Sequence, residues 1–464
     1  MNKNNNINDQ NIFINSCIRG VANTGYLQPH SLTVLGAAIS KLLAEEYDEP
    51  CAILIATDTR TSSPWIKDAL LKGLGTQDHD LYDAGICPTP FVAKALKEYE
   101  PSDDEESDSF EIKDVEEDGF FALGIVITAS HNPAEYNGIK ILTEFGYLTV
   151  EIEEEISYIY HDLMQKQNSV QRLPMPECID IDLIDFYEKT IAQQLDNVPF
   201  KNISVLLDCA NGATALIAPY IFQTCGINAA AINNQQNGAL INVNSGCGNP
   251  SLLLDAIKKN NTTWGCAFDG DGDRLVIVHQ SGRIFDGDDI LMIIAQHQGY
   301  EEFPTLVGTI MTNQAIVECA ENNKKTFIRA KVGERNIIEK LIEHQAMLGA
   351  ETCGHITMMD HAFCSDGIFA ALLFFDTITA QPGLLEMNCE KYPQVHISVP
   401  LHHKTIDNKA IHTVVSKYQD QTSRVIVRKS NTEPVLRIMV EDKDQQVAQK
   451  VATELQQTFL EIIK

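Results

Sequence analysis

A serine that could act as a covalent carrier stands in the tight polar turn Thr128 to Pro133. The turn follows an apolar run over residues 123–127, which predicts a buried strand. Pro133 discourages helix at the residue before it, so the chain turns there. A small hydroxyl side chain in such a turn is available to react with a ligand and is not packed in the core. Ser130 is therefore the first candidate for chemistry, and the neighbouring His131 is not expected to face it as a hydrolase base would.

Three carboxylates alternate with glycines at Asp269, Asp271 and Asp273, and Arg274 follows directly. Glycine supplies the backbone freedom that lets carboxylates at this spacing converge on one cation. Oxygen ligands suit Mg²⁺. A calcium EF-hand fits poorly, because Arg274 and Gln280 occupy the positions where that loop needs Gly and Glu. The pattern predicts a one-ion Mg²⁺ site, with an ordinary Asp/Gly turn between strands as the alternative.

The loop Gly349 to His355 places Glu351 and His355 four residues apart, with Cys353 between them. Together the carboxylate and the imidazole could hold sugar hydroxyls or an amine by hydrogen bonds. By itself the pair is weak evidence, because a Glu and a His in a loop are more often ordinary surface residues. On this pattern Glu351, Cys353 and His355 are candidate substrate contacts, with ordinary surface residues as the alternative.

Many side chains that could donate hydrogen bonds to an anion lie close together between two expected strands, from Arg428 to Arg437. Arginine is suited to bidentate recognition of phosphate. A polar hairpin turn with ordinary surface bases is the alternative, but it leaves the density of donors unexplained. The predicted phosphate cradle consists of Arg428, Ser430, Asn431, Thr432 and Arg437.

Two further cations, Arg19 and Lys140, are candidates for a place beside Ser130. No G-x-S-x-G turn is present, so a hydrolase triad is not expected. A serine, a metal loop, a sugar loop and a phosphate cradle fit one reaction class, phosphoryl transfer, in which catalysis is mostly positioning and charge neutralisation.

The elements that must position these residues alternate between strand and helix patterns, which is typical of α/β layers. Expected strands include residues 52–56, 203–208 and 264–268, and each precedes a turn or helix pattern. We predict three similar α/β domains and a smaller C-terminal α+β domain around a central cleft. Their expected bounds are 1–152 for the serine domain, 153–260 for the second, 261–380 for the metal and sugar loops, and 381–464 for the phosphate loop.

The chain of 464 residues has a formal net charge of −29, which argues against nucleic acid and anionic lipid as partners. A small phosphorylated substrate needs only a local basic cleft. Residues 101–119 hold ten acidic and one basic side chain, and we expect a solvated surface loop there. The longest strongly apolar stretch, Ile368 to Phe375, is too short for a membrane span. No apolar signal-peptide core precedes the first domain, so we expect a cytoplasmic protein.

The twelve cysteines are scattered singly with no C-x-x-C pair. A zinc site or a redox pair therefore finds little support in their spacing. We expect free thiols, which suit a reducing compartment.

With its four motifs in order, the chain resembles the α-D-phosphohexomutase superfamily over nearly its full length. The resemblance implies that Ser130 is a phosphoserine and that its phosphate and the three aspartates hold Mg²⁺. It implies that Arg19, Lys140 and Arg274 are cleft cations, and that a hexosamine 1,6-bisphosphate is intermediate and activator. Lys140 and His355 are candidate general acids or bases.

Within the superfamily the chain is most similar to the phosphoglucosamine mutase branch, on residues 208–213, 330–335 and 355–368. Three residues depart from that branch. Asn431 stands where the branch has Gly and instead resembles the phosphomannomutase/phosphoglucomutase branch, Cys353 replaces a usual Ser, and Cys17 belongs to an altered N-terminal motif. The implied activity interconverts glucosamine 6-phosphate and glucosamine 1-phosphate. The alternatives are a hexose-phosphate mutase and a catalytically impaired paralogue with a binding role; the sequence leaves the oligomeric state open.

Overall fold

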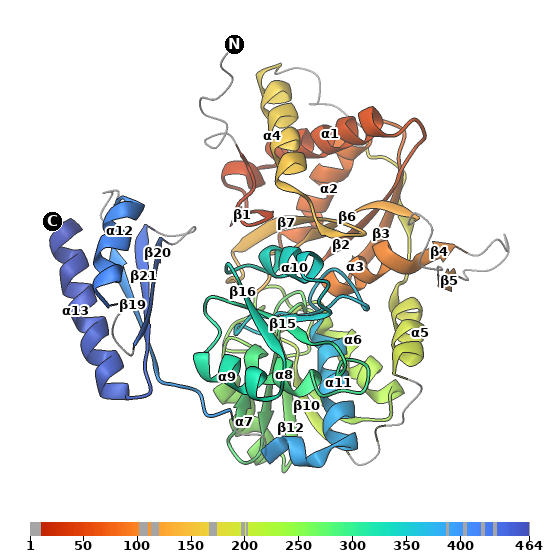
Figure 1. Ribbon diagram of the computed structural model, residues 1–464. Helices are drawn as coiled ribbons and strands as arrows, with labels where there is room; N and C mark the ends of the chain where they lie inside the picture. Colours follow the sequence, from red (N-terminus) through yellow and green to blue (C-terminus); the bar gives the residue numbers. More distant parts are fainter. Residues whose placement is uncertain are drawn as a thin grey trace.

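The computed structural model describes residues 11–101, 110–112, 120–166, 174–195, 200, 203–386, 389–401, 406–418, 423–429 and 434–463. Figure 1 shows three α/β units that form one body and a fourth unit set to one side at the C-terminal end. The predicted acidic loop at 101–119 lies almost wholly outside the described residues. Two short strands that pair with each other are described there, β4 (Tyr99–Pro101) at its start and β5 (Phe110–Ile112) within it.

The first unit is built on a mixed sheet whose central strand, β2, is buried along its whole length. Helices α1 (Pro29–Glu46), α2 (Ser63–Leu74) and α4 (Val150–Gln165) pack together on this sheet, and α3 (Thr89–Glu98) packs on β6 and against α5 (Ile184–Gln194). The strand order is β1 (Cys17–Val21), β7 (Tyr136–Thr143), β6 (Phe121–Ile127), β2 (Ala52–Thr57), β3 (Asp80–Ile86) and β9 (Ile179–Asp180), with β8 (Gly146–Tyr147) beside β7.

The second and third units have smaller sheets of similar design. In the second unit the strand order is β11 (Asn228–Ile232), β10 (Ser204–Asp208), β12 (Trp264–Phe268), β13 (Leu275–His279) and β14 (Ile284–Phe285), and the helices are α6 (Thr214–Thr224) and α7 (Pro250–Lys259). In the third unit the strand order is β16 (Thr326–Ala330), β15 (Thr305–Thr309), β17 (Leu348–Ala350) and β18 (Ile356–Met358), and the helices are α8 (Gly287–Ile294), α9 (Gln314–Asn322), α10 (Glu334–Glu343) and α11 (Gly367–Ala380).

The same hairpin recurs in these three units. In each, a strand that pairs in parallel with its sheet neighbour forms an antiparallel hairpin with the next strand in the chain: β6–β7, β12–β13 and β17–β18. The serine turn joins the first pair, the aspartate loop the second and the Glu351–His355 loop the third. Because the carboxyl ends of parallel strands form the ligand-binding edge of an α/β sheet, the repeat places all three loops at equivalent edges.

The sheets divide the chain differently from the domain bounds expected from sequence. A division at residue 260 would separate β12 from β10, although the two strands pair over Val205–Asp208 and Trp264–Ala267. A division at residue 152 would cut α4, which packs on α1. We therefore propose bounds that follow the sheets, with the second unit ending at β14. A short buried strand carries no signal for which sheet it joins, and this accounts for the difference.

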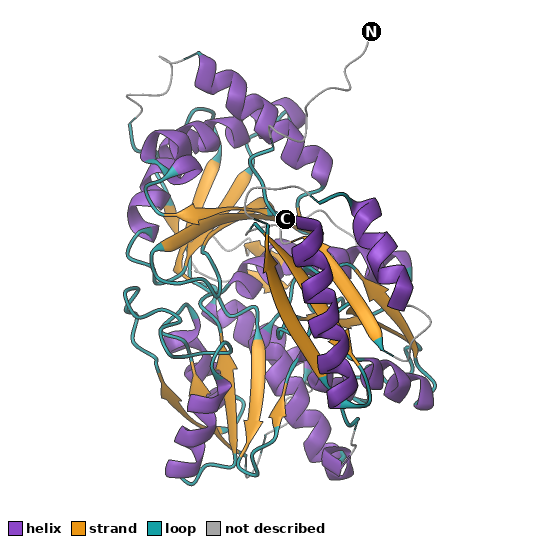
Figure 2. Cartoon of the chain, turned by 90° about the vertical axis from the view of Figure 1, so that its left-hand side faces the viewer, coloured by secondary structure: helices purple, strands orange, loops and turns teal. Residues whose placement is uncertain are grey.

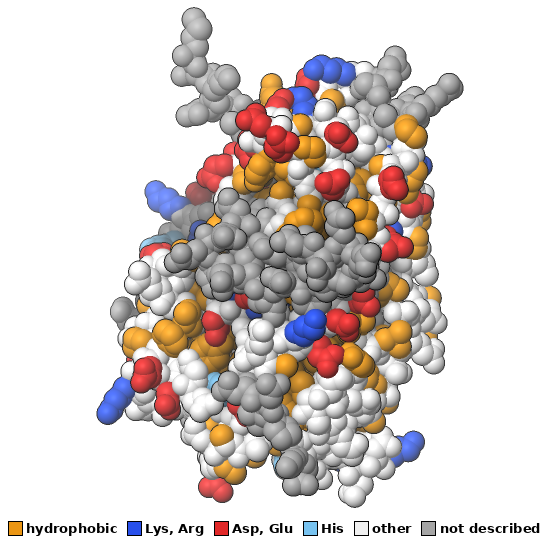
Figure 3. Space-filling view, turned by 90° about the vertical axis from the view of Figure 1, so that its right-hand side faces the viewer, with side chains coloured by type: hydrophobic (Ala, Val, Ile, Leu, Met, Phe, Trp, Pro, Cys, Tyr) orange, Lys and Arg blue, Asp and Glu red, His pale blue; other side chains and the backbone are white. Residues whose placement is uncertain are grey.

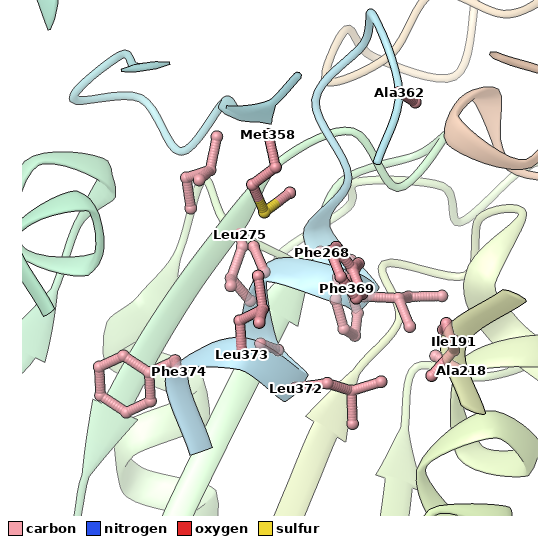
Figure 4. Packing of buried hydrophobic residues seen from close by; sticks show 14 of the residues in the cluster. Ile191, Ala218, Phe268, Leu275, Met358, Ala362, Phe369, Leu372, Leu373 and Phe374 are labelled. Atoms are coloured by element: carbon pink, nitrogen blue, oxygen red, sulfur yellow. The ribbon is translucent and has the colours of Figure 1, made fainter. Parts of the chain in front are cut away.

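The core of the body runs across the units without a break. It centres on α11, whose side chains are buried on nearly every side. Figure 4 shows Phe369, Leu372 and Phe374 of this helix packed with strand residues of the second unit, and Ile191 of α5 at the same core. Helix α11 is too apolar to present a polar face, so it lies inside the body, as its sequence predicts.

The fourth unit is a three-stranded antiparallel sheet backed by two helices (Figure 2). Its order is β19 (Gln394–Pro400), β21 (Val435–Glu441) and β20 (Arg424–Lys429), with α12 (Asn408–Val415) and α13 (Gln445–Ile463). Arg424 attaches it to the third unit by donating to the carbonyl oxygens of Ile310 at 2.7 Å and Thr312 at 2.9 Å, while pairing with Glu441 at 2.9 Å.

One expectation about the cysteines is corrected. Cys319 on α9 forms a disulfide with Cys389, just before β19. The other ten cysteines are free, and Cys353 is the exposed one among them. A bond across 70 residues of sequence has no local signature, so single cysteines could not reveal it.

Among the described residues no helix is both long and apolar enough to cross a membrane. On the face shown in Figure 3, acidic side chains are more numerous than basic ones, in keeping with the net charge of −29.

Candidate active site

Ser130 lies in the turn after β6 with a left-handed backbone conformation, φ 51°, which is uncommon for a residue other than glycine. Only 2% of its surface is exposed. Its backbone N–H donates to Thr128 Oγ1 at 2.9 Å, and its hydroxyl donates to Asp269 Oδ2 at 2.6 Å. His131 Nδ1 lies 3.3 Å from the same hydroxyl, nearer than expected for adjacent residues but farther than the carboxylate. The turn therefore aims the serine at the aspartate loop.

Arg60 binds the backbone of the serine turn, a role that was not predicted from the sequence. Its guanidinium is fully buried and donates to the carbonyl oxygens of Ser130 at 2.9 Å, Asn132 at 2.8 Å and Tyr136 at 2.9 Å. Asp58 pairs with its Nε at 2.8 Å. The signal was available, since charged residues at 58 and 60 directly follow the buried strand β2, at the same sheet edge as the serine turn.

A second anchor for the turn comes from another unit. Asn242, before α7, donates to the carbonyl oxygens of Ser130 at 2.8 Å and Asn132 at 3.0 Å. The loop that contains Gly270 also lies close to the serine turn, because a Cβ atom at Gly270 would lie 2.6 Å from the Ser130 carbonyl oxygen. Nothing in the local sequence marks Asn242, because its partners lie 110 and 112 residues away.

The three predicted metal ligands converge as expected. Ligand atoms of Asp269, Asp271 and Asp273 all lie within 4.8 Å of one another, and the three residues are buried. Lys140 donates to Asp271 at 2.6 Å and to Asp273 at 2.5 Å. Asp271 Oδ1 is buried and has no hydrogen-bond partner among the described residues. Three clustered carboxylates with an unpartnered oxygen fit a hard cation such as Mg²⁺.

The charges in this cluster are not balanced by the protein alone. Burial raises the pKa of Asp269 to about 8, and the neighbouring carboxylates of Asp273 and Asp271 add to that rise. Burial also opposes ionisation of Asp273, but Lys140, with His355 and Arg274, outweighs it and holds the pKa of Asp273 well below its usual range. Arg274 lies 3.8 Å from Asp269, yet the pKa of Asp269 stays raised, so a bound cation would favour ionisation of Asp269 next to Ser130.

The sugar loop predicted from sequence lies against the aspartate loop. Leu275 N–H donates to Gly354 O at 2.9 Å, which docks the two loops together. His355 Nδ1 lies 3.0 Å from Glu351 Oε2, and its Nε2 lies 3.0 Å from Arg274 Nε and 3.3 Å from Asp273 Oδ1. Although burial lowers the pKa of His355, the neighbouring Asp273 carboxylate raises it well above its usual value. Arg274, Glu351 and His355 thus belong to the same site as Ser130.

Two other residues complete the neighbourhood of the serine. Arg19 Nη1 donates to Asn132 Oδ1 at 3.2 Å, so the predicted cleft cation lies beside the serine turn. Burial, together with the positive charges of Arg274 and Arg19, lowers the pKa of His131 to about 3. His131 is therefore neutral, and the positive charge beside Ser130 comes from the arginines and Lys140.

The phosphate cradle lies in a different unit. Arg428 of β20 pairs in register with Arg437 of β21, and Arg437 donates to Ser398 Oγ at 2.8 Å. Ser430, Asn431 and Thr432 lie outside the described residues. The fourth unit meets the body at the opposite end of these strands, near Arg424 and Glu441. The described residues show no contact between the two arginines and the serine site.

Comparison with protein-family models identifies four consecutive matches. The matching models are those of phosphoglucomutase/phosphomannomutase, as alpha/beta/alpha domain I over residues 10–167, domain II over 185–282, domain III over 286–394 and the C-terminal domain over 403–457. The second and third matches meet between residues 282 and 286, next to β14, where the sheets also divide.

Curated relatives match over nearly the whole chain. A phosphoglucosamine mutase of Caldicellulosiruptor saccharolyticus is 33% identical over 455 residues, covering 94% of this chain and 96% of the relative. A phosphoglucosamine mutase of Clostridioides difficile is 30% identical over 460 residues with the same coverage.

Solved structures share the fold. A phosphoglucomutase/phosphomannomutase family protein from Burkholderia thailandensis superposes with a TM-score of 0.79 at 22% identity, covering 97% of this chain and 96% of that one. An Aspergillus fumigatus N-acetylphosphoglucosamine mutase, solved with GlcNAc-6P and magnesium, superposes with a TM-score of 0.55 at 17% identity, covering 72% of this chain and 88% of that one.

Proposed function

This chain belongs to the phosphoglucomutase/phosphomannomutase family and is an isomerase of the phosphohexomutase type, and from that premise we propose that it interconverts glucosamine 6-phosphate and glucosamine 1-phosphate. The observation that carries the mechanism is the hydroxyl of Ser130, which lies 2.6 Å from one of three clustered, buried carboxylates. A phosphoryl group on that oxygen would lie directly beside the cation site.

The proposed reaction has two balanced transfers. In the first, the bond between Ser130 Oγ and phosphorus breaks while the 1-hydroxyl oxygen of glucosamine 6-phosphate bonds to that phosphorus; the hydroxyl gives its proton to a base in the site and Ser130 Oγ takes up a proton. The glucosamine 1,6-bisphosphate then turns over in the site. In the second, Ser130 Oγ loses its proton and bonds to the phosphorus of the 6-phosphate, the bond from that phosphorus to the 6-oxygen breaks, and the 6-oxygen takes up a proton. Lys140 and His355, which both contact Asp273, are the proposed groups for these proton exchanges.

Asp269, Asp271 and Asp273 are the residues that would hold Mg²⁺, together with an oxygen of the phosphate on Ser130. When bound, the ion neutralises charge on the transferring phosphoryl group. Arg60 and Asn242 fix the carbonyl oxygens of the serine turn, so the hydroxyl keeps its direction. Free glucosamine 1,6-bisphosphate is the proposed activator, because it can load an unphosphorylated Ser130.

The far phosphate of the sugar would be held by the fourth unit. Arg428 and Arg437 stand side by side on β20 and β21 and offer two guanidiniums to one anion. We include Ser430, Asn431 and Thr432 in this phosphate set on their sequence position. The fourth unit must then approach the body when substrate binds, which its limited attachment near Arg424 permits.

The choice of sugar rests on the loop between β17 and β18. Glu351 is buried, and His355 and Arg274 hold its pKa below the usual value although burial opposes this. A buried carboxylate suits the ammonium group of an amino sugar. The curated phosphoglucosamine mutases, 30–33% identical, support the same choice. Asn431 favours the second candidate, a phosphomannomutase/phosphoglucomutase.

The test combines intact mass with a substrate panel. The purified protein should carry one phosphoryl group, or accept one from a hexose bisphosphate with Mg²⁺, and S130A should carry none. A matched variant, S281A, changes an exposed serine and should load like the wild type. Turnover should be faster with glucosamine phosphates than with glucose or mannose phosphates. A protein that never loads contradicts the mutase proposal, whereas a loaded protein that prefers hexose phosphates contradicts only the choice of sugar.

We further propose that the partner is the small phosphosugar alone, without nucleic acid or membrane, and that the enzyme acts in the cytoplasm. The ten free cysteines support a reducing compartment, whereas the Cys319–Cys389 disulfide is of a kind that is rare there.

A further inference from the structure

The sugar loop, Gly349 to His355, has a polar connection to the start of helix α8. Thr352 Oγ1 donates to Asp288 Oδ2 at 3.0 Å, and Asp288 in the first turn of α8 is fully buried. The backbones also approach closely, because Gly287 N–H donates to Thr352 O at 3.4 Å and a Cβ atom at Gly287 would lie 2.0 Å from Glu351 O. A movement of the sugar loop therefore acts directly on Asp288.

The same carboxylate oxygen also binds the residue that begins helix α9. Asn313 N–H donates to Asp288 Oδ2 at 3.3 Å. Asn313 is buried and caps α9, since its side-chain oxygen accepts from Ala315 N–H at 3.1 Å. One atom of Asp288 therefore joins the sugar loop to the capping residue of α9.

Asn313 in turn holds the segment that leads into the fourth unit. Residues 389–393, which we call the linker, run from the body to β19 (Figure 1). Asn313 Oδ1 accepts from Tyr392 N–H at 3.0 Å, and Asn313 Nδ2 donates to Tyr392 O at 2.9 Å. The neighbouring Thr312 carbonyl oxygen accepts from Arg424 of the fourth unit at 2.9 Å. The turn before α9 therefore contacts both the linker and the fourth unit.

We propose that Asp288 is a positioning residue that couples the sugar loop to the orientation of the fourth unit. The contacts that carry the coupling form one path, from Thr352 through Asp288 and Asn313 to Tyr392. This inference rests on the proposed function, because it takes the sugar to bind at the sugar loop and its far phosphate to bind at the fourth unit. Substrate on the sugar loop would then favour the position in which the fourth unit meets that phosphate.

The Asp288 carboxylate has two ways to bind its donors. Its Oδ1 is buried and has no hydrogen-bond partner among the described residues, so Thr352 and Asn313 share Oδ2. In the second arrangement each donor would bind a separate oxygen. Coupling between distant sites requires an element with two arrangements that both sites can bias. A movement of the sugar loop would shift this balance and with it the position of Asn313, which holds the linker.

The first test uses T352V, which removes the hydroxyl and keeps the shape of the side chain. Hydrogen exchange of the full chain without ligand is followed by mass spectrometry. We expect exchange over residues 389–396 to become about two- to thirtyfold faster, the range found for residues along such paths, while β12 and β13 exchange as in the wild type. T352S keeps a hydroxyl and should behave like the wild type. The control T379V removes a threonine hydroxyl that donates only to Phe375 O within α11 of the same unit, and it should leave the linker unchanged.

A double variant tests whether the effect passes through Asp288. D288A removes the acceptor of both donors, so exchange of the linker should be at least as fast as in T352V. The change T352V should then add nothing in D288A/T352V, because the bond that it breaks is already absent. Additive effects in the double variant would show that Thr352 reaches the linker by another route and would overturn the role of Asp288.

The second test adds substrate. Saturating glucosamine 6-phosphate with Mg²⁺ should slow exchange of the linker in the wild type and do so less in T352V. The KM of T352V should rise about two- to thirtyfold with a smaller change in kcat.

Wild-type exchange in T352V, or a uniform rise over the whole third unit, would contradict the proposal, since a merely structural role loosens the unit evenly. Protection of the sugar loop by substrate without any change in the linker would also contradict it. If glucosamine 6-phosphate protects neither segment while T352V still loosens the linker, the path through Asp288 stands and the proposed sugar contacts fail.

Discussion

At the scale of single residues, the site depends on a serine held in a costly backbone conformation. A non-glycine residue at φ 51° persists only when its surroundings fix it. Arg60 and Asn242 do this by binding the carbonyl oxygens of the turn, and Thr128 binds the Ser130 N–H. The reactive hydroxyl is therefore directed by residues that need not touch the substrate.

Replacing Arg60 tests this arrangement. R60M removes the guanidinium from its fully buried ion pair with Asp58 and leaves the Tyr136 carbonyl oxygen without that donor, so we expect the free energy of unfolding to fall by about 3–5 kcal/mol. R60K keeps the charge, but one ammonium cannot replace the planar guanidinium, so kcat should still fall. Denaturant unfolding and amide exchange over residues 128–133 measure both effects.

The control for Arg60 is K67M, which removes the partly exposed ion pair of Lys67 with Asp83 in the same unit. K67M should lower the free energy of unfolding by no more than about 1 kcal/mol and should leave amide exchange in the serine turn unchanged. An R60K protein with wild-type exchange and turnover would show that Arg60 does not position Ser130.

At the scale of elements, one hairpin is used three times. The pairs β6–β7, β12–β13 and β17–β18 each place a loop at the carboxyl edge of a sheet. The first loop brings the proposed carrier serine, the second the proposed metal ligands and the third the proposed sugar contacts. The tertiary contact that joins them is direct, since Gly354 O accepts from Leu275 N–H and Ser130 donates to Asp269. The fold thus assembles one site from three equivalent parts.

The disulfide acts at the same scale, because it ties α9 to the segment before β19. Alkylation of the denatured protein without reductant should modify ten cysteines, and all twelve after reduction. The double variant C319S/C389S removes a cross-link over 70 residues, so the free energy of unfolding should fall by up to about 4 kcal/mol in the chain-entropy account. Intact mass and denaturant unfolding provide the measurements.

C178S/C225S is the matched pair of free, half-buried cysteines and should have a smaller effect. Twelve adducts in the absence of reductant would contradict the disulfide.

At the scale of the whole molecule, Arg428 and Arg437, the arginines of the proposed phosphate site, lie in a different unit from Ser130. Arg424 is one polar link between the fourth unit and the body, because it donates to the carbonyl oxygens of Ile310 and Thr312 while it pairs with Glu441 of its own unit. A domain that closes on a ligand loses conformational freedom when the ligand binds. A contact that already restricts the domain in the free protein lowers this entropy cost and therefore favours binding.

Loosening that link should weaken substrate binding. R424M removes charge-assisted hydrogen bonds worth about 1.5–3 kcal/mol each. We expect KM to rise about tenfold with a smaller change in kcat, and small-angle scattering to show a broader distribution of sizes without substrate. The control K450M alters an exposed lysine on α13 of the same unit. If R424M leaves both KM and the scattering unchanged, Arg424 does not set the position of the fourth unit.

The sequence by itself determined the local parts of this protein. A strand followed by a turn, alternating Asp and Gly, and the Glu351–His355 loop are short patterns whose chemistry depends on neighbours within a few residues. The expected strands at 52–56 and 203–208 and the apolar helix over α11 follow from the same local signals, as do Ser130 and the three aspartates.

Only the tertiary structure decided which distant elements meet. Arg60 and Asn242 hold Ser130 from 70 and 112 residues away, β12 joins the second sheet, and Cys319 pairs with Cys389. These contacts depend on strand order and on packing across the common core, and their free energy exists only once the whole body has formed. A local pattern can name the residues that react, but the direction of the Ser130 hydroxyl is set by groups brought to it by the fold.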